Sequence, residues 1–146
     1  MTTRTDLIET LTALGKKRGM SLWTLKSPEL GLLLMSFTQT VALDETFTER
    51  GFSERVERWL EREGDILRTD FAELRRALID LQFFDRDVAG TVYRRAPAWP
   101  RRWRELCQAV EDVALSDVLA QARAAEAGRR EERKRLALIR SLAPSL

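Results

Sequence analysis

Apolar residues recur along much of the chain at the spacing of amphipathic helices. Near the N-terminus one helical face collects Leu7, Ile8, Leu11 and Leu14, and Gly15 follows as a stop. A second helix is expected from residue 27, because Ser27 is a good N-cap and Pro28 suits the first helical position. Its apolar run is almost continuous, so this helix should be buried on more than one side.

The middle of the chain predicts two more helices. The stretch TFTERGF, residues 46–52, suits a short strand or an extended link, and Ser53 is expected to cap the helix that follows. Asp70 is placed to cap the amide of Glu73 at the start of the next helix. The predicted core-facing stripe of this helix consists of Phe71, Leu74, Leu78 and Leu81.

After Gln82 the period shortens to that of strands. The runs FFDRD and TVYRR flank VAG, in which Gly90 tolerates the positive φ of a tight turn. The resulting order is helix, short strand, helix, helix and hairpin, which is the order of a winged helix-turn-helix. Pro97 and Pro100 end this unit, because proline extends neither a paired strand nor a helix interior.

Two helical segments are expected beyond the prolines, separated by a break near Gly128. The fold class is therefore mainly α with a small β-hairpin: a winged helix-turn-helix core with additional N- and C-terminal helices. We divide the chain into an N-terminal helix and basic linker (residues 1–27), a winged-helix domain (28–96) and a C-terminal helical extension (97–146).

Composition excludes several classes of chemistry. With 146 residues, 44% of them hydrophobic and 33% charged, the chain has the length and composition of one globular domain. It has no His and a single Cys107, so a His-based zinc site, a His general base and an internal disulfide are all excluded. Cys107 lies in an amphipathic pattern, where a buried structural thiol is expected. We expect no enzyme and no cofactor.

The longest apolar run, Leu32 to Met35, is far too short to cross a membrane. We therefore expect a cytoplasmic protein that has no membrane partner. The 25 basic and 23 acidic residues leave a net charge of +2, so no overall basic field indicates a nucleic-acid partner. The distribution of charge is more informative than its total.

Two groups of residues in the middle of the chain form a recognisable family pattern. The helical group is Asp70, Leu74, Arg75, Arg76, Leu78, Ile79 and Asp80, and the hairpin group is Arg86, Asp87, Gly90 and Tyr93. With these residues, the segment 52–95 resembles the DUF2087 family over about the middle third of the chain. The resemblance implies a winged-helix-like module found in bacterial transcriptional regulators, without a defined ligand. The sequence departs from the family pattern in three ways: the usual His is absent, with Arg68 and Thr69 near its place, Gln82 replaces a Gly, and Arg94 replaces a Trp.

The helix that begins near residue 70 is the candidate recognition helix. Its predicted outer face carries Ala72, Glu73, Arg76 and Asp80, with Arg75 on the flank. Arg76 suits contact with base edges, whereas the two acids oppose phosphate, so a solvated, ion-paired face is the alternative. Residues 44–70 hold nine acids and five bases, which favours a solvated surface or a basic partner over a phosphate clamp.

The most basic stretch, residues 94–104, contains five arginines, Trp99 and Trp103 and no acid. Trp103 begins an apolar stripe and is expected in the core. The arginines suit phosphate, an acidic protein or simple solvation. The predicted nucleic-acid-binding residues are Arg76, Arg94, Arg95, Arg101 and Arg102.

Residues 123–140 hold seven bases and three acids, and a solvated helix face with pairs such as Glu131 with Arg135 is expected there. The apolar end, Leu136, Ile139 and Leu142, suits packing against a second chain, so a homodimer through terminal helices is expected. The sequence favours a bacterial transcriptional regulator or accessory factor that binds double-stranded DNA. A protein-interaction adaptor on the same scaffold and RNA binding through the Arg/Trp strip remain alternatives.

Overall fold

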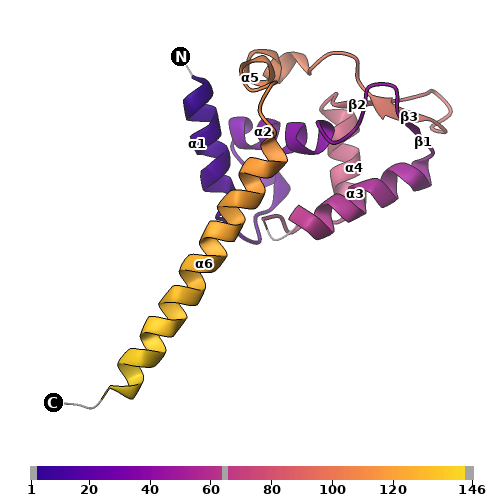
Figure 1. Cartoon of the computed structure of the whole chain (residues 1–146). Helices are drawn as coiled ribbons and strands as arrows, with labels where there is room; N and C mark the ends of the chain where they lie inside the picture. The colour runs from indigo at the N-terminus through magenta and orange to yellow at the C-terminus, as the bar shows by residue number, and fades with distance from the viewer. Residues whose placement is uncertain (1–2, 64–65, 144–146) are drawn as a thin grey trace.

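The computed structural model describes residues 3–63 and 66–143, and Figure 1 shows the arrangement of the elements. In chain order these are α1 (Arg4–Gly15), the 3-10 turn η1 (Leu22–Thr24), α2 (Ser27–Thr38), β1 (Thr46–Phe47), α3 (Glu49–Glu63), α4 (Phe71–Asp80), β2 (Phe84–Arg86), β3 (Tyr93–Arg95), the 3-10 turn η2 (Arg101–Trp103), α5 (Arg104–Ala109) and α6 (Leu115–Leu142). The chain is mainly helical with a small sheet, as the sequence predicted.

The sheet has three short antiparallel strands in the order β1-β3-β2. The central strand β3 pairs Tyr93 with Phe47 on one side and with Arg86 on the other. The order from α2 to β3 is helix, strand, helix, helix, strand, strand, which confirms the order predicted from periodicity. The stretch at residues 46–47, predicted as a strand or a link, is the third strand of the sheet.

Two predicted helix caps are wrong by different amounts. Helix α2 begins one residue early, so that Lys26 is the N-cap and its amide donates to the Glu29 carboxylate at 2.9 Å. Helix α3 begins at Glu49, and the Thr48 hydroxyl accepts the Gly51 amide at 3.0 Å. Ser53 therefore lies inside α3, where its hydroxyl is available to a neighbouring helix.

Helix α2 is the centre of the core, and all its residues from Leu30 to Thr38 are buried. Helices α1, α5 and α6 pack against it. Toward the sheet, aromatic rings continue the core: Phe37 lies 5.6 Å from Phe84, and Phe52 lies 4.8 Å from Phe84 and 5.2 Å from Tyr93, all measured between ring centroids. This cluster fixes α3 and the hairpin to α2, because rings of this size bury large apolar areas.

Trp103 lies in the core as predicted. Only 4% of the residue is exposed, and its indole N–H donates to the Ser27 carbonyl at 2.9 Å. A Cβ on Gly31 would lie 2.6 Å from the indole ring, so glycine is what lets the ring pack flat on α2.

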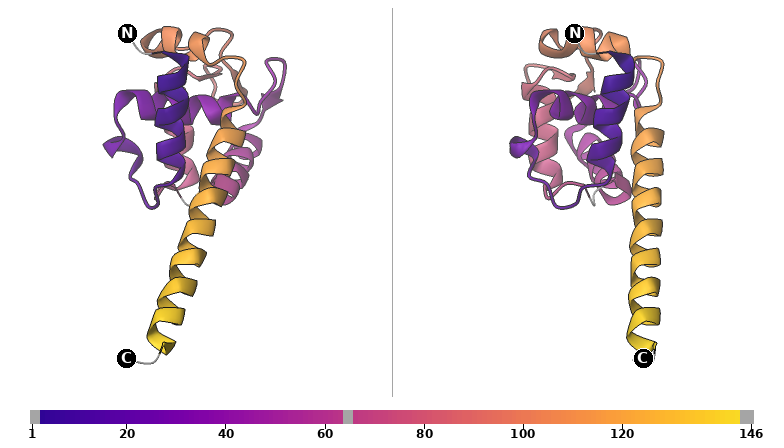
Figure 2. Two further views of the ribbon diagram at one scale, coloured as in Figure 1. Left: turned by 60° about the vertical axis from the view of Figure 1, so that its left-hand side comes forward. Right: turned by 90° about the vertical axis from the view of Figure 1, so that its left-hand side faces the viewer.

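Helix α6 is one continuous element through Gly128, so the predicted break there is wrong. Its first half packs on α1 through Leu115, Leu119 and Ala122, and a Cβ on Gly15 would lie only 2.7 Å from the Cβ of Ala122. Its second half runs past the body of the protein (Figures 1 and 2), and residues 131–143 are all exposed. Within the described ranges, no helix is long and apolar enough to cross a membrane.

Candidate nucleic-acid interface at helix α4 and the hairpin

Helix α4 is oriented by the residues that it buries. The Asp70 carboxylate accepts the Glu73 amide at 2.8 Å and so caps the helix start, as predicted. Leu74, Ala77 and Leu78 face the core. Phe71 was expected beside them, but it is 38% exposed at the first turn, where no neighbouring element covers it fully. The opposite face leaves Arg76 and Asp80 exposed.

The end of α4 turns the chain into the hairpin through a Schellman motif. The Phe83 amide donates to the Leu78 carbonyl at 2.9 Å, and the Gln82 amide donates to the Ile79 carbonyl at 3.1 Å. Gln82 has a φ of +69°, in the left-handed region that favours glycine. The glycine that the family pattern has at this position thus has a conformational reason, and Gln82 keeps the conformation without it.

The hairpin loop is built around Asp87. Its carboxylate accepts the Thr91 amide and hydroxyl, both at 2.6 Å, and the Val92 amide at 3.1 Å. These donors, with the Thr91 hydroxyl as the strongest, hold the pKa of Asp87 below its ordinary value. Gly90 has a φ of +71°, as its predicted turn position requires. The loop therefore has a defined shape and presents Val88 to solvent, fully exposed.

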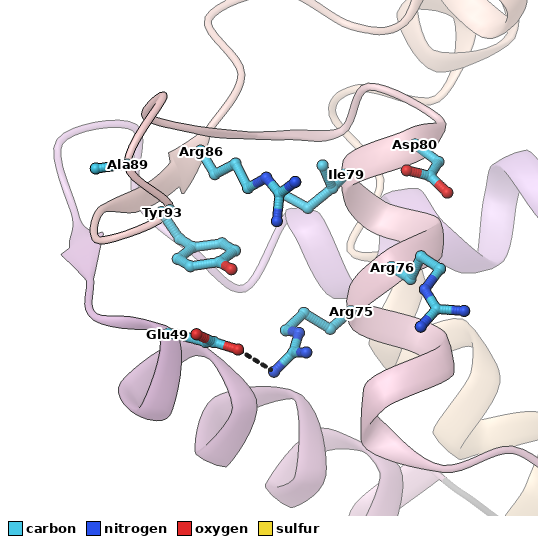
Figure 3. Close-up of a pocket in the computed structure, with 9 residues that line it drawn as sticks. Glu49, Arg75, Arg76, Ile79, Asp80, Arg86, Ala89 and Tyr93 are labelled. Atoms are coloured by element: carbon cyan, nitrogen blue, oxygen red, sulfur yellow. Dashed lines mark ion pairs between the residues drawn. The ribbon is translucent and has the colours of Figure 1, made fainter.

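A cleft of about 430 Å³ lies between α4, the start of α3 and the hairpin (Figure 3). It is lined by Glu49, Arg75, Arg76, Ile79, Asp80, Arg86, Ala89, Gly90 and Tyr93. Arg75 enters it on the flank of α4, donates to the Ser53 hydroxyl at 2.6 Å and pairs with Glu49 at 3.3 Å. Arg75 therefore ties α4 to α3.

Arg86 is a cleft residue that the sequence indicated only as a hairpin position of the family pattern and not as a binding residue. Its register partner is Tyr93, so both side chains lie on the same face of the sheet as the cleft. The alternation of side chains along the strands could have placed Arg86 on the same face of the sheet as the buried Tyr93. That step requires the pairing register of the two strands, which the sequence alone leaves open.

The five predicted arginines divide into two groups. Arg76, Arg94 and Arg101 are exposed and form no ion pair within the part of the chain that the structure describes. Arg95 is half-buried: it donates to the Val41 carbonyl at 3.0 Å, and its guanidinium carbon lies 4.8 Å from the ring centroid of Trp99. Burial lowers the pKa of Arg95, although nearby Glu111 acts in the opposite direction.

Arg102 is exposed but, like Arg95 and unlike the first three arginines, contacts other parts of the fold. It donates to the Ser27 hydroxyl at 3.2 Å, and its guanidinium carbon lies 4.3 Å from the ring centroid of Trp103. The basic stretch 94–104 thus does not form one surface, since Arg94 and Arg95 are consecutive in a strand and point to opposite faces.

Cys107 is fully buried in α5, and burial raises the pKa of its thiol to about 12, with a smaller contribution from Glu111. The thiol is therefore protonated at neutral pH and has the character of a core residue. Across residues 3–63 and 66–143, no group of three or more Cys, Asp and Glu side chains is placed to hold a metal ion.

Fold and site together define a small, mainly helical protein with a three-stranded antiparallel sheet and an arginine-lined cleft between α4, the start of α3 and the hairpin. The chain belongs to the DUF2087 family, whose model, described as uncharacterized protein conserved in bacteria, matches residues 22–95. The match covers half of the chain and begins well before the resemblance recognised at residues 52–95, so it includes α2 and β1. Comparison with curated proteins and with solved structures finds no match.

Proposed function

We propose that the protein binds double-stranded DNA, with α4 directed to the major groove and the β2–β3 hairpin lying beside it on the backbone. The observation that carries the proposal is the position of Arg76: it is exposed on α4, one turn from the small Ala72, and has no acidic partner among the described residues. A bidentate guanidinium on an exposed helix face suits both guanine edges and phosphate.

The hairpin supplies further cationic groups. Arg86 lies on its cleft side and Arg94 on its outer side, both exposed. Asp85 is paired in register with Arg94, and Asp80 lies one turn from Arg76, so carboxylates partly offset the positive field. We therefore expect binding of moderate affinity that weakens strongly with salt.

The test is the salt dependence of binding to sheared bacterial genomic DNA, measured by fluorescence anisotropy. A variant with Arg76, Arg86 and Arg94 changed to Gln should bind more weakly, and the slope of log K against log salt should fall by about 2.7 if each arginine neutralises one phosphate. The matched control changes Arg58, Arg62 and Arg140 to Gln, which removes the same charge from exposed positions outside α4 and the hairpin.

Equal losses in the two triple variants would mean that only net charge matters, and α4 would not be the contact. If the parent protein does not bind this DNA in a buffer of about 20 mM salt, where electrostatic binding is strongest, the proposal is wrong. Regulation of transcription is the role that such binding supports, and it is tested by locating bound genomic sites in the native bacterium.

A second candidate function is protein–protein association through the end of α6. The specific observation is four large apolar side chains exposed on the projecting half of that helix, Leu136, Leu138, Ile139 and Leu142. We propose a second copy of the chain as the partner, since a dimer would bring two α4 helices to one duplex. The molar mass from light scattering, measured for the parent and for a variant with Leu136 and Ile139 changed to Ser, tests this. A parent protein that is monomeric at a concentration of about 100 μM overturns the proposed dimer.

A further inference from the structure

We infer that the cleft between α4, the start of α3 and the hairpin is a binding site for a phosphate group. The group arrives either as a phosphodiester of the DNA backbone or as part of a soluble phosphate ester. The inference does not depend on the proposed DNA binding, because the donors that support it lie inside the cleft rather than on the outer face of α4.

The first observation is an excess of positive charge. Arg75 and Arg86 enter the same side of the cleft from different elements, whereas Arg76 and Asp80 lie together on the other side of α4 (Figure 3). Glu49 pairs with Arg75, and Arg86 has no ion-pair partner among the described residues. Over the whole lining, three guanidinium groups face two carboxylates, which leaves a formal charge of +1. This charge matches one phosphodiester.

The second observation is an unused donor. Only 2% of Tyr93 is exposed, and its ring is held by stacking on Phe52 with centroids 5.2 Å apart. Its hydroxyl forms no hydrogen bond within the described part of the chain and is not one of the buried polar atoms there that lack a partner, so the oxygen reaches the solvent of the cleft, into which Figure 3 shows it directed. The hydroxyl is therefore available to donate to a ligand in the cleft. Here the ring is fixed and the O–H faces the space between the two arginines.

The set of donors selects the ligand. Arginine offers N–H donors and no acceptor, and the Arg75 Nη1 group already serves Ser53 and Glu49, so its other amino group remains. Together with Arg86 and the Tyr93 hydroxyl, these groups converge on an acceptor-rich, negatively charged partner. A tetrahedral phosphate has oxygens for several such donors at once. The cleft is also larger than one phosphate, which leaves room for the group that the phosphate carries.

The direct test uses inorganic phosphate as the probe at constant ionic strength, with the arginine Nε–Hε signals followed by NMR. We expect saturable shifts of the Arg75 and Arg86 signals. In R86Q the dissociation constant should rise at least tenfold, and in Y93F it should rise several-fold. The control R58Q changes an exposed arginine of α3 that lies outside the cleft and should bind phosphate as the parent does.

Y93F is informative because the hydroxyl has no partner in the fold, so the ring and its stacking are preserved and the variant should unfold at the parent's temperature. Shifts that grow linearly without saturation, or that are equal in all variants, would indicate ionic screening and overturn the inference.

A 16-base-pair duplex then distinguishes the two sources of the phosphate group. Displacement of inorganic phosphate by the duplex identifies the DNA backbone as the source. Phosphate binding that the duplex does not disturb identifies a soluble ester. Duplex binding that depends on Arg76 and Arg94 and is unchanged in Y93F, with no binding of inorganic phosphate, overturns this inference and leaves the proposed function intact. Binding of inorganic phosphate without any duplex binding does the reverse.

Discussion

The turn after α4 contains a glutamine in a left-handed backbone conformation that favours glycine, so a substitution there measures the cost of this conformation. Gln82 has a φ of +69° and forms the left-handed position of the Schellman motif that directs the chain into β2. Its side chain is exposed and forms no hydrogen bond among the described residues. The change Gln82→Gly therefore removes conformational strain without removing a contact.

The expected gain follows from two opposing terms. The left-handed conformation costs an L-residue about 1–2 kcal/mol. Glycine loses more backbone entropy on folding, which takes back about 0.5–1 kcal/mol. The net expectation is an increase of about 0.5–1 kcal/mol in the free energy of unfolding, with Tm higher by about 1–4 °C. Phe83 and Leu78, whose amide and carbonyl close the motif, should keep their hydrogen bond.

Urea unfolding followed by circular dichroism measures this change, and an unchanged m-value would show that the unfolded state is the same. Two controls bracket it. Gln82→Ala keeps the strain and should give no gain. Gly90→Ala introduces strain at a φ of +71° where a Cβ meets nothing within 4 Å, so it should destabilise by about 1 kcal/mol through the backbone alone. If Gln82→Gly is no more stable than the parent, the strain argument is wrong.

Three further predictions concern other parts of the fold. Gly15→Val should lower the free energy of unfolding by about 1–3 kcal/mol in urea melts, because even a Cβ would lie 2.7 Å from that of Ala122 and α1 would have to move from α6; an unchanged midpoint would refute the close packing. The Cys107 thiol should resist alkylation at pH 8 in the native protein and react fully in urea, since burial raises its pKa to about 12; rapid native modification would contradict this. The lowered pKa of Asp87 means that its stabilisation of the hairpin is present above its unfolded pKa of about 3.9 and is lost as pH falls through the lower folded value. The amide shift of Thr91 should therefore titrate below about pH 3.9, and D87N should abolish that titration.

Much of the helical framework could be predicted from local patterns. Leu74 and Leu78 recur at helical spacing and are buried, Asp70 caps α4, and Gly90 turns the hairpin. These features depend on interactions within a few residues, so the amino acids near each position are sufficient to indicate them. The predictions at Ser53 and Gly128 were wrong about where a helix starts or stops. Packing against other elements can move a helix end by several residues, and local patterns do not show this.

The contacts of individual arginine side chains could not be predicted from local patterns. Arg95 and Arg94 are neighbours in the sequence, but only Arg95 meets the Val41 carbonyl and the Trp99 ring. Arg75 was placed on the flank of α4 by helical geometry, yet its partners Ser53 and Glu49 come from a different helix. Such partners lie far along the chain, and only the packing of α3, α4 and the sheet brings them together.

By itself, the sequence determined the order of helices and strands from α2 to β3, the burial of Trp103 and the lack of histidine chemistry. Periodicity and turn residues act locally, and composition applies to the whole chain. The tertiary structure alone decided which cationic groups face one another. It brought Arg75, Arg86 and the unpartnered Tyr93 hydroxyl to one cleft from three separate elements. The register of the sheet and the angle between helices decide that convergence, and both result from side-chain packing over the whole core.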